Sequence, residues 1–119
     1  MIYISTGGMK NYSAWQASEL LLDRGIKNIE LSGGLSDPDN LGKLKNLSKN
    51  INFQIHNYFP PPENPFVFNL ASLNPKVSQL SYDHARNAIN WAVELGSDIY
   101  SFHSGFLIDP KVDELGKKI

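Results

Sequence analysis

The sequence contains no cysteine, which excludes a disulfide framework, thiolate metal ligands and thiol nucleophiles. It has no apolar run close to the roughly 18 residues that a membrane-spanning helix needs, and no signal-peptide core follows Met1. Neither sign of charge dominates, because 11 Lys+Arg and 12 Asp+Glu give a net charge of −1. Such a balance does not attract nucleic acid or an anionic membrane. We therefore expect a soluble, cytoplasmic protein.

Charged residues are scarce in general. They make up 19% of the 119 residues, whereas about 25% is usual for a soluble domain. The hydrophobic fraction of 41% is sufficient for a core, and the length predicts one domain over residues 1–119. The low charge indicates that part of the surface is normally covered by more protein.

Short β-prone segments alternate along the chain with helical patterns. Strands are predicted at 2–5, 26–32, 51–57 and 98–103. The first helix should follow a Ser13–Gln16 capping box and end at Gly25, and the second should begin at Asp37-Pro38. A third helix is expected from Ser78 or Ser81 to Gly96, with one buried face made of Ala85, Ile89, Ala92 and Val93. A fourth helix is expected to begin at Asp109-Pro110. This order implies parallel strands joined by right-handed crossovers.

The predicted strands alternate between apolar and polar residues, and this alternation distinguishes between two parallel α/β architectures. A doubly wound sheet, covered by helices on both faces, would give continuous apolar strands. Polar residues instead occupy every second position, as in Asn28, Glu30, Asn52, Gln54 and His56. One polar face is typical of a parallel barrel, whose active site lies at the carboxyl ends of its strands. A complete TIM barrel takes about 250 residues, so we predict an α/β parallel half-barrel, the first four strands of a TIM barrel.

Two histidines end neighbouring strands of this predicted sheet. His56 ends the third strand and His103 the fourth, both with the parity of the polar face. Their imidazoles should therefore lie close together, where they could share a zinc ion or flank one substrate. The alternative is two histidines that bond only to backbone at strand ends.

A carboxylate and a further histidine accompany this pair. Glu30 lies at the matching depth of the second strand and could act as a base or bind a sugar hydroxyl; an ion pair with Lys or Arg is the alternative. His84 lies beside Asp83 and Arg86 and is expected to be a solvated helix residue.

The long connection at 58–76 contains five prolines and is longer than most connections in compact domains, which favours a functional loop. Its aromatic residues could either form an apolar wall over a ligand or plug the loop onto the sheet: Tyr58, Phe59, Phe66 and Phe68.

Several short motifs, in order, resemble the segment from the third to the fourth strand of the xylose-isomerase-like TIM barrels, the superfamily of sugar (phosphate) isomerases/epimerases and endonuclease IV. The motifs are Ile55-His56, Asn69-Leu70-Ala71-Ser72, Glu94-Leu95-Gly96 and Phe102-His103-Ser104-Gly105. The resemblance covers most of the chain, is densest between 55 and 105, and implies the N-terminal half of such a barrel.

The resemblance implies roles for the same residues. In endonuclease IV the matching histidines are zinc ligands, which implies His56 and His103 as metal ligands. In the isomerase/epimerase branch they line the sugar site, and a glutamate like Glu30 commonly ends the second strand. The implied function is a metal-dependent sugar or sugar phosphate isomerase/epimerase with Zn, Mn or Mg.

The later carboxylate ligands of that branch come from strands five to eight. The resemblance thus implies that this chain alone holds part of the site, with Glu30, His56 and His103 in catalytic roles, and is inactive. The alternatives are an endonuclease IV-like zinc-dependent hydrolase of abasic DNA and a non-catalytic half-barrel scaffold. Two unpaired strand edges also lead us to expect a homodimer or larger assembly.

Overall fold

Four parallel strands form one sheet in the computed structural model, which describes residues 1–116. The strands are β1 (Ile4–Ser5), β2 (Asn28–Leu31), β3 (Asn52–His56) and β4 (Tyr100–Ser101), in the spatial order β1-β2-β3-β4. Ile29 is in register with Ile4 and Phe53, and Ile55 with Tyr100. The predicted α/β class and the all-parallel pairing are confirmed.

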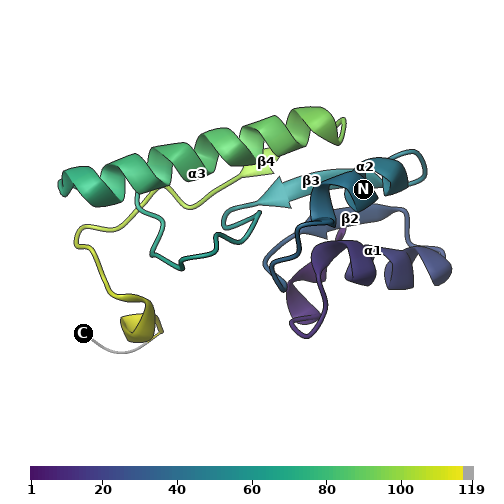
Figure 1. The fold of residues 1–119 in the computed structure, drawn as a ribbon, viewed down its shortest axis with the longest axis horizontal. Helices are drawn as coiled ribbons and strands as arrows, with labels where there is room; N and C mark the ends of the chain where they lie inside the picture. Colours follow the sequence, from purple (N-terminus) through teal and green to yellow (C-terminus); the bar gives the residue numbers. More distant parts are fainter. Residues whose placement is uncertain (117–119) are drawn as a thin grey trace.

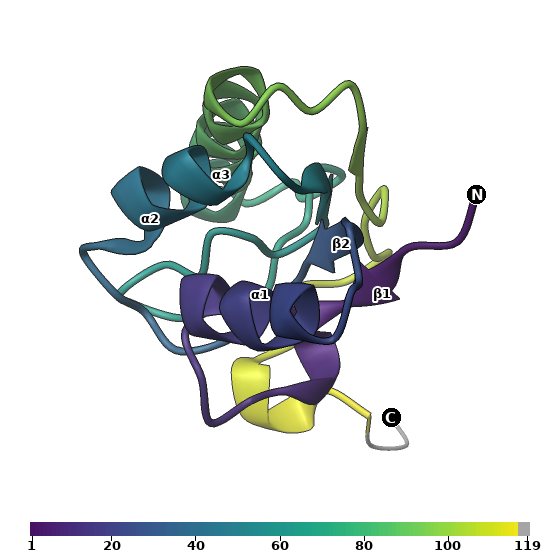
Figure 2. The same ribbon diagram turned by 90° about the vertical axis from the view of Figure 1, so that its right-hand side faces the viewer.

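Three helices cover one side of this sheet (Figure 2). They are α1 (Ala14–Asp23), α2 (Asn40–Leu47) and α3 (Pro75–Glu94), with short 3-10 turns at Thr6–Gly8 and Val112–Glu114. Ile29, Leu31 and Ile55 point into this layer and are fully buried. The alternate strand residues face the side without helices, as the sequence pattern predicted. No helix among residues 1–116 has the length and apolar character needed to cross a membrane.

The starts of the first two helices are tied together by side chains. Gln16 Oε1 accepts a hydrogen bond from the Ser13 N–H at 3.1 Å, which is the glutamine half of the predicted capping box. The Asp37 carboxylate accepts from the Asp39 N–H at 2.8 Å and from Trp15 Nε1 at 2.7 Å. Both hydrogen bonds hold the pKa of Asp37 below its ordinary value, and the bond from the Asp39 N–H has the larger effect. The cap of α2 is Asp39, two residues later than predicted.

The third helix begins earlier than predicted and buries a different face. Asn74 is its N-cap, with Oδ1 accepting from the Lys76 N–H at 2.9 Å, and Pro75 occupies the first turn, where its missing N–H costs nothing. The predicted starts at Ser78 or Ser81 were therefore wrong. Of the predicted buried face, Ala92 is buried and Ala85 is half-buried, but the other two residues are not. Ile89 and Val93 are exposed, and the buried residues are Ser81, His84, Ala88 and Ala92.

The segment after β4 also differs from expectation. Residues 109–116 contain the turn Val112–Glu114 and no α-helix, so the helix predicted from Asp109-Pro110 is not formed within the described part of the chain. The loop after β3 and this segment extend beyond the same end of the sheet (Figure 1). Both therefore lie at the carboxyl ends of the strands.

Candidate functional site

A row of polar side chains crosses the helix-free face of the sheet at its carboxyl end. We call it the polar row; its members are Glu30, Gln54, His56, Ser101 and His103. Strand register places Glu30 beside Gln54 and His56 beside Ser101. Gln54 Nε2 donates to Glu30 Oε2 at 3.0 Å, and His56 Nδ1 is hydrogen-bonded to Ser101 Oγ at 3.2 Å. Side-chain bonds thus link adjacent strands and fix the row across the sheet.

The two histidines lie side by side within the polar row. Their ring centroids are 5.6 Å apart and the rings are nearly perpendicular, at 80°. Glu30 Oε1 lies 3.9 Å from His56 Nδ1. Because Nδ1 of His56 is engaged with Ser101 and Glu30, Nε2 is the ring nitrogen with which His56 could bind a ligand. The structure therefore brings together Glu30, His56 and His103, the three residues selected from the sequence; their chemical roles stay predictions.

The polar row fits only part of a metal site. Among residues 1–116, no three His, Asp, Glu or Cys side chains are arranged to hold one ion. Two adjacent imidazoles suit two positions of a tetrahedral zinc, which takes about four ligands. His56 and His103 could supply these two, and further ligands would have to come from outside the described residues.

Asn57 connects the histidine pair to the helix layer. It has a left-handed backbone, with φ of 37°, which asparagine tolerates better than most residues. Its Oδ1 accepts from the His103 N–H at 3.0 Å. Its carbonyl accepts from His84 Nε2 at 3.0 Å and from the Tyr100 hydroxyl at 2.9 Å, and burial raises the pKa of Tyr100 to about 12. Asn57 thereby positions the backbone of His103, a role that sequence reasoning missed.

His84 is buried, and the expectation of a solvated residue was wrong. It is 6% exposed, because α3 turns this side of the helix toward the loop after β3. Its ring centroid lies 5.2 Å from Tyr58, 6.1 Å from Phe66 and 5.3 Å from Phe68. Burial lowers the pKa of His84 below its ordinary value of 6.5, an effect that the bond to the Asn57 carbonyl partly offsets.

We predict that His84 makes the protein less stable in acid. Because its pKa is lowered in the folded state, the unfolded chain binds the proton at higher pH. Stability is therefore fully present above pH 6.5 and falls as the pH drops below that value. His84→Gln keeps an N–H donor but cannot be charged, so the free energy of unfolding should depend less on pH. Denaturant unfolding at pH 7.5 and 5.5 checks this; equal pH dependence in both proteins would contradict it.

The aromatic residues of the long loop divide between the core and the wall of a pocket. Phe59 and Phe68 are buried at 0% and 5% exposure and plug the loop onto the helix layer. Tyr58 and Phe66 are half-buried, and with His103 they line a pocket of about 330 Å³. The loop thus borders the candidate site.

Asn69 holds that loop to the segment after β4. It is 1% exposed, and its Nδ2 donates to Asp109 Oδ1 at 2.8 Å and to the Phe106 carbonyl at 3.3 Å. Its Oδ1 accepts from the N–H groups of Ala71 and Phe106 at 3.1 and 2.9 Å. Gly105, with φ of 142°, packs so closely against Asn69 that a side chain there would collide with it. The sequence motif contained Asn69, but only the fold shows this bridging role.

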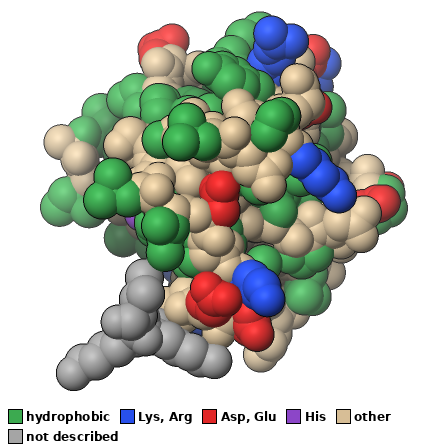
Figure 3. Space-filling view, turned by 90° about the vertical axis from the view of Figure 1, so that its left-hand side faces the viewer, with side chains coloured by type: hydrophobic (Ala, Val, Ile, Leu, Met, Phe, Trp, Pro, Cys, Tyr) green, Lys and Arg blue, Asp and Glu red, His purple; other side chains and the backbone are tan. Residues whose placement is uncertain are grey.

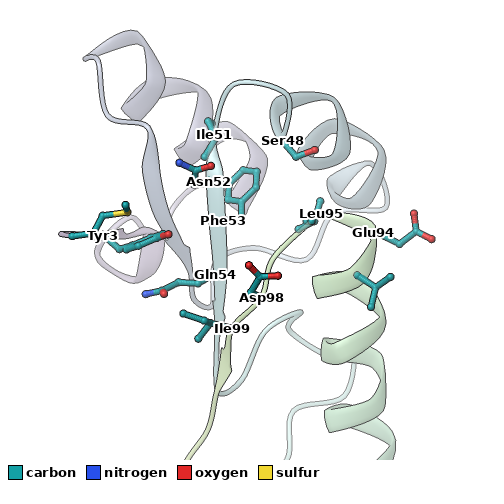
Figure 4. Close-up of a pocket in the computed structure, with 13 residues that line it drawn as sticks. Tyr3, Ser48, Ile51, Asn52, Phe53, Gln54, Glu94, Leu95, Asp98 and Ile99 are labelled. Atoms are coloured by element: carbon teal, nitrogen blue, oxygen red, sulfur yellow. The ribbon is translucent and has the colours of Figure 1, made fainter.

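A larger hollow of about 610 Å³ lies near the amino ends of β3 and β4 (Figure 4). Asn52, Phe53, Asp98 and Ile99 line it, with Tyr3 across the opening. It shares Gln54 with the polar row but none of the histidines. In parallel α/β folds, ligands bind outside the carboxyl ends of the strands. We therefore place the candidate site at the polar row and the smaller pocket.

Comparisons with known proteins show the fold alone. No protein-family model matches the sequence, and no curated protein matches it. A solved structure of the TTHB071 protein from Thermus thermophilus, soaked with ZnCl2, is similar with a TM-score of 0.58 and 23% identity. The match covers 94% of this chain and 43% of that one. The chain therefore spans less than half of the length of this structural neighbour.

Proposed function

We propose that this chain is the N-terminal half of a xylose-isomerase-like TIM barrel and carries part of the substrate site of a sugar or sugar phosphate isomerase/epimerase. The polar row is the observation that carries the proposal. It lies at the carboxyl ends of parallel strands, on the face that a closed barrel would turn inward, which is where TIM-barrel enzymes act. The match to part of a longer neighbour is consistent with a half-barrel.

Each residue of the row has a role in the proposed site. The Glu30 carboxylate, held by Gln54, accepts a hydrogen bond from a sugar hydroxyl. His56 and His103 orient the sugar or join a metal shell, with His103 fixed through Asn57. A divalent metal, when bound, polarises a carbonyl or hydroxyl of the sugar. Because this chain supplies only part of the site, we expect no isomerase activity from it alone.

The histidine pair also supports a second candidate, a zinc-dependent hydrolase of abasic DNA. Adjacent imidazoles at 5.6 Å suit zinc, and the structural neighbour was soaked with ZnCl2. The net charge of −1 weighs against it, because DNA-binding proteins gain most of their affinity from cationic contacts with phosphate. A scaffold without chemistry would bind neither sugar nor zinc at the row.

We predict that monosaccharides bind at the polar row. Titration of the ¹⁵N-labelled 119-residue chain with D-xylose and D-fructose 6-phosphate should shift the amide signals of Glu30, His56 and His103. His56→Ala should weaken binding about tenfold, the equivalent of one lost hydrogen bond. Asn52→Ala is the control, since Asn52 bonds to Asn28 on the same face, away from the histidines. Shifts elsewhere, or equal affinity in both variants, would contradict the proposal.

A zinc titration of the same proteins separates the two enzymatic candidates. Sugar binding that needs no zinc but needs His56 supports the isomerase/epimerase site. Tight zinc binding that is lost with His56→Ala, without any sugar binding, supports the hydrolase.

A further inference from the structure

The pocket beside the polar row has an apolar wall. Its volume is about 330 Å³, and Tyr58, Phe66 and Phe68 of the loop face Phe106, Val112 and Leu115 of the segment after β4. His103 belongs both to the pocket and to the polar row, so the two are continuous. Hydrophobic side chains also gather on the outer surface at this end of the molecule (Figure 3).

Two of the polar groups that line the pocket are already engaged in hydrogen bonds within the protein. The Tyr58 hydroxyl accepts from the Phe66 N–H at 2.8 Å, and Asn57 Oδ1 accepts from the His103 N–H at 3.0 Å. No Lys, Arg, Asp or Glu is among the described residues that line it. A phosphate or carboxylate placed against the aromatic and aliphatic side chains of the wall would lose its hydration without gaining a partner from them, which is costly. The pocket therefore favours an uncharged group.

The wall is held in place before any ligand arrives. Tyr58 and Phe66 pack edge to face with ring centroids 5.6 Å apart, and both rest against the buried His84. Asn69 fixes the loop to the opposite wall through Phe106. A pre-formed pocket does not spend binding energy on ordering its walls.

We propose that this pocket binds an uncharged apolar substituent of the sugar whose hydroxyls lie on the polar row. The inference rests on the proposed function and narrows its substrate to sugars that carry an aryl or acyl group. The volume of 330 Å³ is near the lower limit for ligand pockets, which begin at about 300 Å³, and suits one such group. The aromatic wall packs against that group while His103 lies at its junction with the sugar.

The test compares phenyl β-D-glucopyranoside with methyl β-D-glucopyranoside on the 119-residue chain, by calorimetry and ¹⁵N NMR. The phenyl compound should bind about tenfold more tightly, because its ring leaves water for the pocket. Its addition should shift the amide signals of Tyr58, Phe66 and Leu115. Equal affinity for the two glucosides would overturn the inference.

Two matched variants locate the binding. Leu115→Asp places a carboxylate in the pocket and should remove the preference for the phenyl compound. Leu107→Asp adds the same charge to a fully exposed residue of the same segment that does not line the pocket, and should keep the preference. Both side chains are exposed, so folding should survive each change. A preference that survives Leu115→Asp would overturn the inference.

Phenol separates a failure of the pocket from a failure of the proposed function. Phenol binding that is sensitive to Leu115→Asp, without any contribution of the glucose ring or of His56, would keep the pocket but refute the sugar site. Absence of phenol and phenyl glucoside binding would refute the pocket, whereas His56-dependent binding of methyl glucoside would keep the sugar site. The amide signals of the pocket residues could also move when the protein is diluted, and not when phenol or phenyl glucoside is added. That result would show that a second copy of the chain occupies the pocket, and it would also overturn the inference.

Discussion

The 119-residue chain is expected to sediment as a homodimer or a larger assembly at micromolar concentration. The sheet order leaves β1 and β4 with one unpaired edge each among the described residues, and unpaired parallel edges invite further strands. Apolar side chains lie exposed beside both edges, with Ile4 at 40% and Ile99 at 52% exposure. The simplest assembly places β4 of each copy beside β1 of the other, with two-fold symmetry and eight strands in a closed sheet.

Sedimentation velocity or light scattering checks this expectation directly. Ile4→Lys combined with Ile99→Lys puts a charge on each edge, which natural edge strands use to prevent pairing, and should shift the protein toward a monomer. Leu73→Lys is the control, since Leu73 is fully exposed in the loop after β3 and away from either edge. A soluble wild-type monomer with cooperative unfolding would mean that the sheet is self-sufficient, and the half-barrel proposal would give way to a small open α/β sheet.

Asn69→Leu is expected to lower the free energy of unfolding by about 2 kcal/mol, because it removes several hydrogen bonds of the buried amide, each of which contributes roughly 0.5–1.5 kcal/mol. The substitution keeps the branching at Cγ but replaces the amide with two larger methyl groups, and it leaves the Phe106 N–H and the Asp109 carboxylate without their bonds to Asn69. The segment after β4 should detach from the loop after β3, and the apolar pocket should lose one wall.

Denaturant unfolding measures this loss, and ¹⁵N NMR follows the segment. Asn69→Asp keeps the acceptors while removing the donors and adding a charge beside Asp109, so it should also destabilise. Asn52→Ala removes an exposed side chain that, within residues 1–116, bonds to Asn28, and should change stability by less than about 0.5 kcal/mol. A loss in Asn69→Leu no larger than in this control would show that the bridge is not needed.

The alternation of the strands was sufficient to predict much of the site. Because side chains in a strand point alternately to opposite faces, the positions of Glu30, Gln54 and His56 determine that they share one face. Parallel order then brings the carboxyl ends of β3 and β4 together, so the proximity of His56 and His103 followed from local pattern and connectivity.

Helix faces were harder to predict, and the buried face of α3 was wrong. Its apolar residues Ile89 and Val93 suggested one stripe, but the helix buries a side rich in small residues and His84. A polar residue such as His84 enters the interior only when a partner is present, and that partner, the Asn57 carbonyl, is 27 residues away in sequence.

The sequence by itself determined the parallel α/β architecture, the polar face and the histidine pair. These features depend on the alternation of apolar and polar residues within each strand and on the order of strands and helices along the chain. Only the tertiary structure decided the roles of Asn57, His84 and Asn69 and the shape of the apolar pocket. Asn69 meets Asp109 across 40 positions of the chain. Such contacts depend on how two loops close over the end of the sheet, and local periodicity carries no information about that closure.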